Sequence, residues 1–266
     1  MARIAIVAAM HEELRAVLQA MPDEQPRARA GREFWLGHLD GHDVVAVLSG
    51  IGKVAAAATA TLLLTEFEAT QIIFTGAAGG LGEHVRVGDV VVADGLTQHD
   101  MDASPLFPRF EVPLTGITQF KPDPALSDVL ARAAQAVLAE AASAADEHLD
   151  GALTGTHLRA FGISAPHVHR GLIVSGDRFV ATQGEADELR AVLPAALAVE
   201  MEGAALAQVC HDFGVPFAVV RTVSDRADDS AHVDFNQFIE DVAAHYSLAI
   251  VPRSLRLLAA APGAAA

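Results

Sequence analysis

Short apolar runs alternate along most of the chain with segments whose apolar residues recur at helical spacing. Residues 3–9 are apolar and predict a buried strand, and the apolar positions that follow, up to Met21, predict a helix. Five more apolar runs predict strands at 71–74, 89–93, 172–174, 197–199 and 217–223. Helices are predicted at 54–65, at 203–213 and in a last segment whose shared face carries Phe235, Phe238, Ile239, Val242, Tyr246 and Ile250.

The order of these elements predicts the fold class. Residues 34–39 and 44–48 flank Asp40-Gly41 and predict a hairpin, with a four-residue connection that is looser than the ideal two-residue turn. Apolar strands that alternate with helices predict a sheet covered on both faces, and the hairpin makes that sheet mixed. We therefore expect an α/β fold, a single three-layer αβα domain over residues 1–258 with a mixed, largely buried central sheet, followed by a low-complexity tail at 259–266.

Two segments show no clear period. Residues 99–122 contain four prolines and predict an extended loop at an active site or an interface. Residues 139–169 are first alanine-rich and then rich in glycine and histidine, which predicts a surface excursion.

Composition limits the classes of partner. The chain has 18 basic and 34 acidic residues, a formal net charge of −16, whereas proteins that bind nucleic acid or anionic lipid present basic surfaces. No stretch approaches the roughly 20 apolar residues of a membrane helix, and the apolar run at 4–10 lacks the features of a secretion signal. A single cysteine, Cys210, excludes a disulfide within the chain. We expect a cytoplasmic protein without nucleic-acid or membrane partners.

Three carboxylates follow predicted strands. Glu13 comes after the first strand, Glu202 after the strand at 197–199, and Asp225 after the strand at 217–223. Because open α/β sheets build ligand sites at the carboxyl ends of their strands, these acids are expected to converge. The alternative for each one is a helix cap or a first-turn acid. Glu202 fits that alternative least, because Glu200 and Glu202 place two acids beside a core strand, where an unused carboxylate is costly.

Small-residue segments form a second class of candidate. SGIGK at 49–53 and TGAAGG at 75–80 both follow strands and predict turns that bring the backbone close to a ligand. Neither has the spacing of a phosphate-binding loop or of a dinucleotide-binding turn.

Seven strings in order resemble one enzyme family. They are MHEE at 10–13, SGIGKVAAA at 49–57, TGAAGGL at 75–81, VGDVVVAD at 87–94, GLIVSGDRF at 171–179, AVEMEGAALA at 198–207 and RTVSD at 221–225. Together they resemble the 5′-methylthioadenosine/S-adenosylhomocysteine nucleosidases, which belong to the nucleoside phosphorylase superfamily. The resemblance runs from Arg3 to about Leu255 and implies a nucleoside phosphorylase-like fold, a homodimer, a part in methionine salvage and a hydrolase that uses no cofactor.

The resemblance also implies a role for each catalytic candidate. Glu13 would position or deprotonate the attacking water, and Glu202 would hold the ribose hydroxyls. Asp225 would protonate N7 of the leaving adenine. Arg221 and Ser224 would orient the catalytic acids.

Seven residues would bind the substrate by the same resemblance. Met201 would pack against the sugar, Phe179 would stack on the base, and the backbone of Val180 would hydrogen-bond to the base. Ala77 occupies a position that is usually serine in the family, so a hydroxyl that would help to bind the attacking water is missing. The sugar and the 5′-substituent would be lined by Met10, Ile51 and Phe235.

The chemistry of glycosidic cleavage asks for these residue types independently. Adenine leaves poorly as an anion, so cleavage needs a proton at N7. A free aspartic acid is ionised at neutral pH, and burial near other carboxylates is the setting expected to keep Asp225 protonated. The developing oxocarbenium ion is cationic, so Glu13 and Glu202 near the ribose would stabilise it.

Other polar residues are open to a second interpretation. His99, Asp100, Asp102, His167 and His169 include metal-ligating types, but the spacing offers no third or fourth ligand, so we expect solvated loop residues and no metal. Cys210 has apolar neighbours on a predicted helix, which favours a small core residue over a nucleophile.

Three rival functions stay open at this stage. A phosphorylase of the same superfamily would use phosphate, although Glu13 would repel it. A hydrolase of aminodeoxyfutalosine-type nucleosides is compatible with the altered stretch HDMDASPLF at 99–107. A catalytically silent nucleoside-binding paralogue is favoured by Ala77 alone and opposed by the three acids.

Overall fold

The chain is described here from a computed structural model, which places residues 2–143, 153–228, 235 and 238–260. The strands are β1 (Arg3–Ala8), β2 (Gln25–Arg29), β3 (Arg32–Leu39), β4 (His42–Leu48), β5 (Ala69–Gly80), β6 (Val90–Gln98), β7 (Val168–Ser175), β8 (Ala196–Glu200) and β9 (Phe217–Asp225). The helices are α1 (His11–Gln19), α2 (Lys53–Thr65), α3 (Pro124–Ser143), α4 (Gly155–Ala160), α5 (Gln183–Val192), α6 (Gly203–Phe213), the π-helical turn η1 (Ile239–Ala243) and α8 (Ala244–Ala259).

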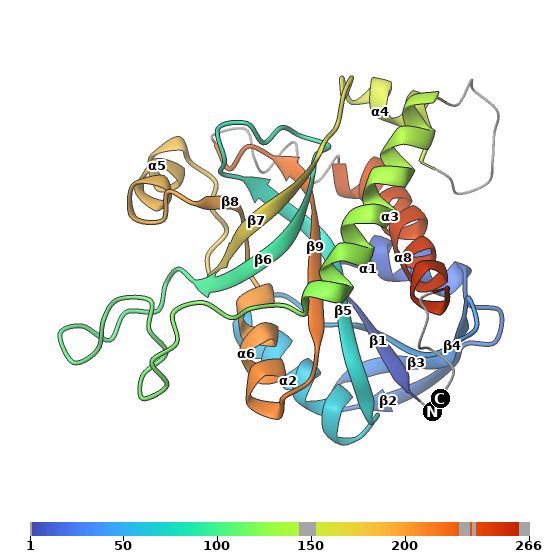
Figure 1. Cartoon of the computed structure of the whole chain (residues 1–266), viewed down its shortest axis with the longest axis horizontal. Helices are drawn as coiled ribbons and strands as arrows, with labels where there is room; N and C mark the ends of the chain where they lie inside the picture. Colours follow the sequence, from blue (N-terminus) through green and yellow to red (C-terminus); the bar gives the residue numbers. More distant parts are fainter. Residues whose placement is uncertain (1, 144–152, 229–234, 236–237, 261–266) are drawn as a thin grey trace.

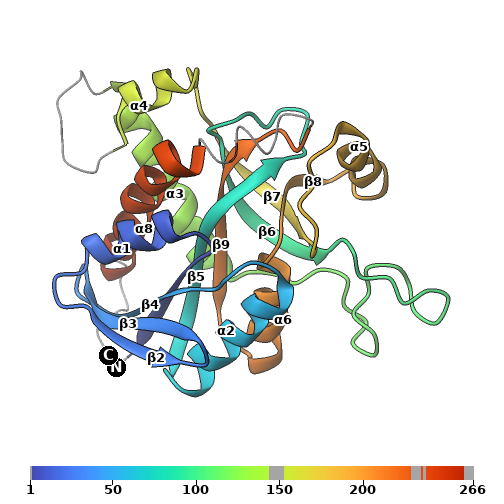
Figure 2. The same cartoon turned by 180° about the vertical axis from the view of Figure 1, so that it is seen from behind.

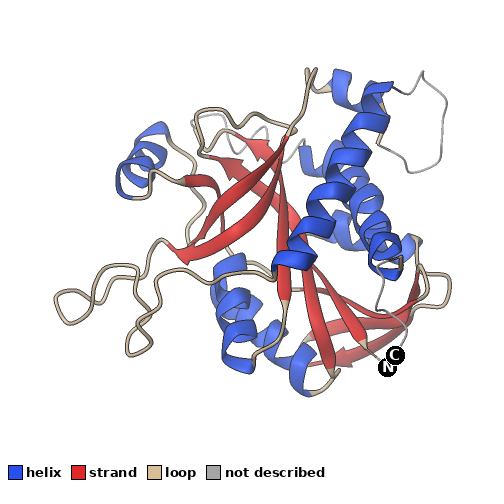
Figure 3. Cartoon of the chain, viewed as in Figure 1, coloured by secondary structure: helices blue, strands red, loops and turns tan. Residues whose placement is uncertain are grey.

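All nine strands belong to one mixed sheet, so the predicted α/β fold class is confirmed. Its order is β2-β3-β4-β1-β5-β8-β7-β6-β9, and β9 also pairs with β5. The second pairing closes β5, β8, β7, β6 and β9 into a ring, from which β1, β4, β3 and β2 extend as an open sheet (Figure 3). The sequence pattern did not predict this closure, because the pairing partners of a buried strand leave no mark on its own apolar run.

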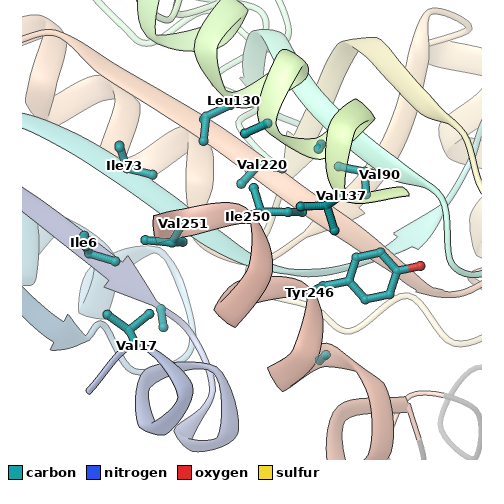
Figure 4. Close-up of a cluster of buried hydrophobic side chains, with 14 of the residues drawn as sticks. Ile6, Val17, Ile73, Val90, Leu130, Val137, Val220, Tyr246, Ile250 and Val251 are labelled. Carbon is teal, nitrogen blue, oxygen red and sulfur yellow. The ribbon is translucent and has the colours of Figure 1, made fainter. Parts of the chain in front are cut away.

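Helices cover both faces of the sheet. On one face α1, α3 and α8 pack over side chains such as Ile6, Ile73 and Val220, and Figure 4 shows Tyr246, Ile250 and Val251 of α8 in this core. On the other face α2 and α6 lie side by side, as both Figure 1 and Figure 2 show. Of the predicted face of the last helix, Phe238, Ile239, Val242, Tyr246 and Ile250 are all buried, and Phe235 is half-buried.

The hairpin between β3 and β4 is tighter than predicted. Both strands reach the turn, so the connection is Asp40-Gly41 alone and not four residues. Positive φ angles of 47° at Asp40 and 82° at Gly41 are those of the two-residue turns that match strand twist.

The segment TGAAGG is not a turn. Residues 75–80 continue strand β5 to Gly80 and pair with β9 and β8. The loop at 49–52 is confirmed between β4 and α2, and Gly50 and Gly52 have φ angles of 75° and 95° that favour glycine.

Of the predictions for the two irregular segments, one is confirmed and the other is largely wrong. Residues 99–122 contain no helix and project from the end of β6 (Figure 1), as predicted for an extended loop. The surface excursion at 139–169 is wrong for much of its length. Residues 139–143 complete α3, residues 155–160 form α4, and Ala141 and Leu158 are buried in the core. Residues 144–152, and 261–266 of the tail, lie outside the described part of the chain.

Candidate active site

A cavity of about 350 Å³ opens where β1, β5, β8 and β9 end. Each of the seven residues predicted to bind substrate lines it, and so do two of the three predicted catalytic acids, Glu202 and Asp225. The full lining is Ala9, Met10, Ile51, Ala77, Ala78, Gly79, Arg178, Phe179, Val180, Val199, Glu200, Met201, Glu202, Asp225 and Phe235. Segments far apart in the sequence therefore meet at one mostly apolar pocket.

Glu202 is the N-cap of α6, two residues after the end of β8, and is 5% exposed. Its Oε1 accepts a hydrogen bond of 2.9 Å from the backbone N–H of Gly52. Burial, and next the negative charge of Glu200, raise the pKa of Glu202 to about 7. The carboxylate is thus a buried group that lines the cavity and is held by the backbone N–H of Gly52.

Glu13 lies in the first turn of α1 and is not one of the lining residues. It is 1% exposed, and the N–H of Met10 donates to its Oε2 over 3.2 Å. Burial raises the pKa of Glu13 to about 7, and the positive charge of Arg221 opposes this rise. The charge of Glu202 also acts on Glu13. The two carboxylates therefore titrate in the same range as neighbours.

Asp225 is the last residue of β9 and is 2% exposed. The hydroxyl of Ser224 donates to Oδ2 over 2.7 Å, and the N–H of Ala227 donates to Oδ1 over 2.8 Å. The backbone of Gly79 packs so closely that an added Cβ would lie 3.0 Å from Oδ1. Ser224 thus contacts the acid that it was predicted to orient.

Arg221 is fully buried, and its ion pair is with Glu200 rather than with Glu13, Glu202 or Asp225. Its guanidinium donates to Glu200 Oε2 over 2.7 Å and stacks 4.0 Å from the centre of the Phe74 ring. Its charge lowers the pKa of both Glu13 and Glu202. Arg221 therefore acts on Glu13 and Glu202 electrostatically. Its ion pair with Glu200 also links it to the chain segment that carries Glu202.

Sequence reasoning gave no role to Glu200, which lines the cavity at the end of β8. Besides Arg221, it accepts hydrogen bonds from the hydroxyl of Ser175 and from the N–H groups of Glu202 and Gly203. These contacts fix the start of α6 and hence the backbone of Glu202. The sequence does carry a signal for this pair. Glu200 ends one buried strand, and Arg221 lies inside another.

The geometry agrees with what comparison with known proteins finds. The family model described as the phosphorylase superfamily matches residues 3–256. This chain belongs to that superfamily.

Relatives within the superfamily cover nearly the whole chain. A Chromohalobacter salexigens protein named 5′-methylthioadenosine/S-adenosylhomocysteine nucleosidase is 36% identical over 97% of this chain and 98% of its own. The solved Neisseria meningitidis nucleosidase of the same name, in complex with methylthio-immucillin-A, has a TM-score of 0.81 and 34% identity, with 97% and 100% of the two chains covered. The predicted resemblance and nucleoside phosphorylase-like fold are confirmed.

A second kind of relative is also similar. The native structure of a Helicobacter pylori futalosine hydrolase has a TM-score of 0.78 and 30% identity, and covers 96% of this chain and 97% of its own. The fold and the superfamily alone therefore do not separate the two substrates.

Of the polar residues predicted to be solvated, Asp100, Asp102 and His167 are exposed as predicted, whereas His99 and His169 are not. His99 is buried against Gly176, and His169 Nε2 lies 2.8 Å from the buried carboxylate of Asp89. Burial also lowers the pKa of His99. The prediction of solvated loop residues is therefore wrong for these two histidines. The part of the chain that the structure describes contains no group of three potential metal ligands.

Two further predictions concern Cys210 and membrane-spanning helices. Cys210 is fully buried in α6, as predicted, and burial raises its pKa to about 12. Within the described ranges, no helix is both long and apolar enough to cross a bilayer.

Proposed function

We propose that the chain hydrolyses the N-glycosidic bond of 5′-methylthioadenosine and S-adenosylhomocysteine to adenine and a 5-thioribose product. The observation that carries the proposal is the meeting of Glu202 and Asp225 in one apolar cavity, with a buried Glu13 hydrogen-bonded to the N–H of the lining residue Met10. The names of the superfamily relatives support the same reaction.

In this mechanism the three acids divide the work. Asp225 protonates N7, so that adenine leaves as a neutral base. Glu202 accepts hydrogen bonds from the ribose hydroxyls, and Glu13 positions the attacking water or takes its proton. As ionised groups, Glu13 and Glu202 stabilise the cationic transition state, which is worth most in a pocket with little water.

The apolar lining receives the rest of the nucleoside. Phe179 stacks on adenine beside the backbone of Val180, and Met201 packs against the sugar. The 5′-thio substituent lies against Met10, Ile51 and Phe235. Phe179 and Phe235 already contact each other edge to face, with ring centres 5.6 Å apart, so they support a single aromatic wall.

Water is favoured over phosphate as the nucleophile. Among the described lining residues only Arg178 is cationic, and it pairs with Glu185. Arg221 is committed to Glu200. A phosphate ion would therefore meet carboxylates without a free cation to offset their repulsion.

The test is to incubate the pure protein with methylthioadenosine, with and without phosphate, and to identify the sugar product. Adenine and a reducing 5-thioribose without phosphate are expected. Strict dependence on phosphate with a sugar 1-phosphate product would overturn hydrolysis. S-adenosylhomocysteine and aminodeoxyfutalosine, assayed in parallel, decide the substrate. A much higher kcat/KM for aminodeoxyfutalosine would favour the second candidate, to which the futalosine hydrolase relative points.

We further propose a homodimer in the cytoplasm that takes part in methionine salvage and has no nucleic-acid partner. Four large apolar side chains support the dimer, because each is strongly exposed and a partner surface would remove it from water. They are Ile51, Val54, Leu106 and Leu114, between 63% and 89% exposed. Light scattering that gives a monomer at micromolar concentration would contradict the dimer.

The proposed domain division is one nucleosidase domain over residues 1–258 and a separate tail at 259–266. Limited proteolysis that removes only the tail would support this division.

A further inference from the structure

Three residues outside the cavity form a closed ring of polar contacts through side chains and backbone N–H groups. Lys53 Nζ donates to Asp100 Oδ1 over 2.6 Å, and the N–H of Asp177 donates to Asp100 Oδ2 over 2.9 Å. The N–H of Lys53 in turn donates to Asp177 Oδ1 over 2.7 Å. The three residues come from the start of α2 and from the segments after β6 and β7, so the ring joins three separate parts of the chain.

The ring lies next to the hydrogen bond between the loop at 49–52 and Glu202. Gly52, whose N–H donates to Glu202 Oε1, precedes Lys53, and an added Cβ on Gly52 would lie 3.1 Å from Asp177 Oδ1. Gly52 has a φ of 95°, and its neighbour Ile51 is 63% exposed, so packing alone does little to hold this loop. The ring restrains the peptide that follows the Gly52 N–H, because the N–H of Lys53 is held by Asp177.

A second set of contacts ties the same lysine to α6. Lys53 Nζ also donates to Gln98 Oε1 over 3.1 Å, and Gln98 Nε2 donates to Gln208 Oε1 over 2.7 Å. Gln208 belongs to α6, the helix that Glu202 begins. Lys53 is therefore linked to Gly52, its neighbour in the chain, and through Gln98 to the helix that Glu202 begins.

We infer that Lys53 and Asp100 are positioning residues of the proposed nucleosidase, which hold the Gly52 N–H on Glu202 and thereby set the ribose-binding geometry. The inference rests on the proposed role of Glu202. Lys53 is suited to a positioning role because its side chain is only 15% exposed. The side chain of its partner Asp100 is 32% exposed. Burial raises the pKa of Asp100, and hydrogen bonds from Lys53 and Asp177 outweigh it and keep that pKa below its usual value.

The ring is expected to matter for position more than for stability. Partly exposed ion pairs contribute about 0–1 kcal/mol to the free energy of unfolding, so a variant that lacks the pair should still fold. The N–H of Gly52 lowers the pKa of Glu202, against the opposing effects of burial and Glu200, while Arg221 also lowers it and Glu13 lies close by. Losing the Gly52 contact should therefore make Glu202 ionise at a higher pH.

The experiment compares Lys53→Met with Lys121→Met, because the chain has only these two lysines. Lys121 makes a single contact of 3.3 Å to a backbone oxygen of Asp94, on the exposed surface, and is a matched control. In Lys53→Met we expect KM for methylthioadenosine to rise about tenfold, as for the loss of one hydrogen bond to a charged group. The acidic limb of kcat/KM should move up by about half a pH unit. Lys121→Met should match the wild type in both.

Two further measurements separate positioning from general damage. The inhibition constant of adenine, which has no ribose, should stay unchanged in Lys53→Met while KM for the nucleoside rises. Lys53→Arg should restore much of the affinity, because it can still donate to Asp100. Asp100→Asn should reproduce the Lys53→Met effect, and the double variant should add little to either one.

The possible outcomes are distinct. Wild-type KM and pH profile in a folded Lys53→Met protein would overturn the inference. Equal weakening of adenine and nucleoside would also overturn it, because the pocket as a whole would then be damaged. A wild-type protein that releases no adenine from any of the three nucleosides would instead refute the proposed function.

Discussion

The two oxygens of the Asp225 carboxylate already accept hydrogen bonds, from Ser224 and from the backbone of Ala227. Asparagine keeps this shape and can donate a hydrogen bond to N7, but it cannot transfer a proton. In Asp225→Asn we therefore expect a folded protein with appreciable affinity for adenine nucleosides and a kcat lowered about 10²-fold or more. Steady-state kinetics with methylthioadenosine, beside a thermal melt, measure both effects.

The competing interpretation of Asp225 is a structural cap at the end of β9. Asparagine is itself a good capping residue, so that interpretation predicts nearly normal rate and stability. A folded Asp225→Asn protein with wild-type kcat would remove the general-acid role and the centre of the proposed mechanism.

Ala77 lines the cavity at a position where the resembling family usually has serine. A serine hydroxyl there would add a hydrogen-bond partner for the attacking water, and it would add only one heavy atom to the side chain. We expect Ala77→Ser to leave kcat/KM within about threefold of the wild type or to raise it, as for one neutral hydrogen bond. A large loss of kcat/KM would show that water is bound elsewhere in this pocket.

At the scale of elements, the apolar runs predicted the strands well because burial on both faces leaves a continuous apolar signature. They missed β2, whose five residues are all exposed and include Pro26. They also misplaced residues 75–80, because glycine is rare inside strands. Glycine is needed in this strand because residues of β9 pack closely against its backbone. A Cβ on Gly76 would lie 3.2 Å from the Arg221 guanidinium, and one on Gly79 would lie 3.0 Å from Asp225.

The candidate site was predicted where a side chain follows a strand, and missed where the contact depends on how loops meet. Glu13, Glu202 and Asp225 fall in the first class. The role of Glu200 depends on its contact with Arg221 in another strand, and the ring that includes Lys53 joins the start of α2 to two segments whose conformations no local pattern reveals.

The glycines of β5 give a prediction at this scale. In Gly79→Ala the new methyl group would press on Asp225 Oδ1 and on the Ala227 side chain, each 3.0 Å away. We expect a kcat lowered about tenfold and a free energy of unfolding lowered by about 1–3 kcal/mol. Kinetics and urea unfolding measure these.

Gly184 provides the control for Gly79. It lies in helix α5 with no atom within 4 Å of an added Cβ, so Gly184→Ala should be neutral or slightly stabilising. Equal effects of the two substitutions would contradict the role of close packing at β5.

For the molecule as a whole, the buried acids set how stability depends on pH. The pKa of Glu13 is about 7 in the folded protein and near 4.5 in the unfolded chain, so between these values the folded state binds the extra proton. Stability must then fall as pH rises from about 4.5 to 7 and stay level above, by about 3 kcal/mol for this one residue. Ligand-free Glu13→Gln should lack this part of the decline in urea unfolding across that range.

The neighbouring Glu12 tests whether the effect belongs to Glu13. Glu12 is in the same helical turn but is only half-buried. Glu12→Gln should keep the wild-type slope of stability against pH. A Glu13→Gln protein with that same slope would contradict the assignment.

Closure of β5, β8, β7, β6 and β9 into a ring leaves β2 as the open edge of the sheet among the described strands. Open edges invite strands from other molecules, and such contacts lead to aggregation. Here Pro26 lacks an N–H to offer, and Arg27 and Arg29 would meet the same charges on an approaching copy. Without residues 25–29, β3 would become the edge strand, and it carries Phe34 and Trp35. The short strand β2, which has no proposed contact with substrate, would then determine whether the protein stays soluble at cellular concentrations.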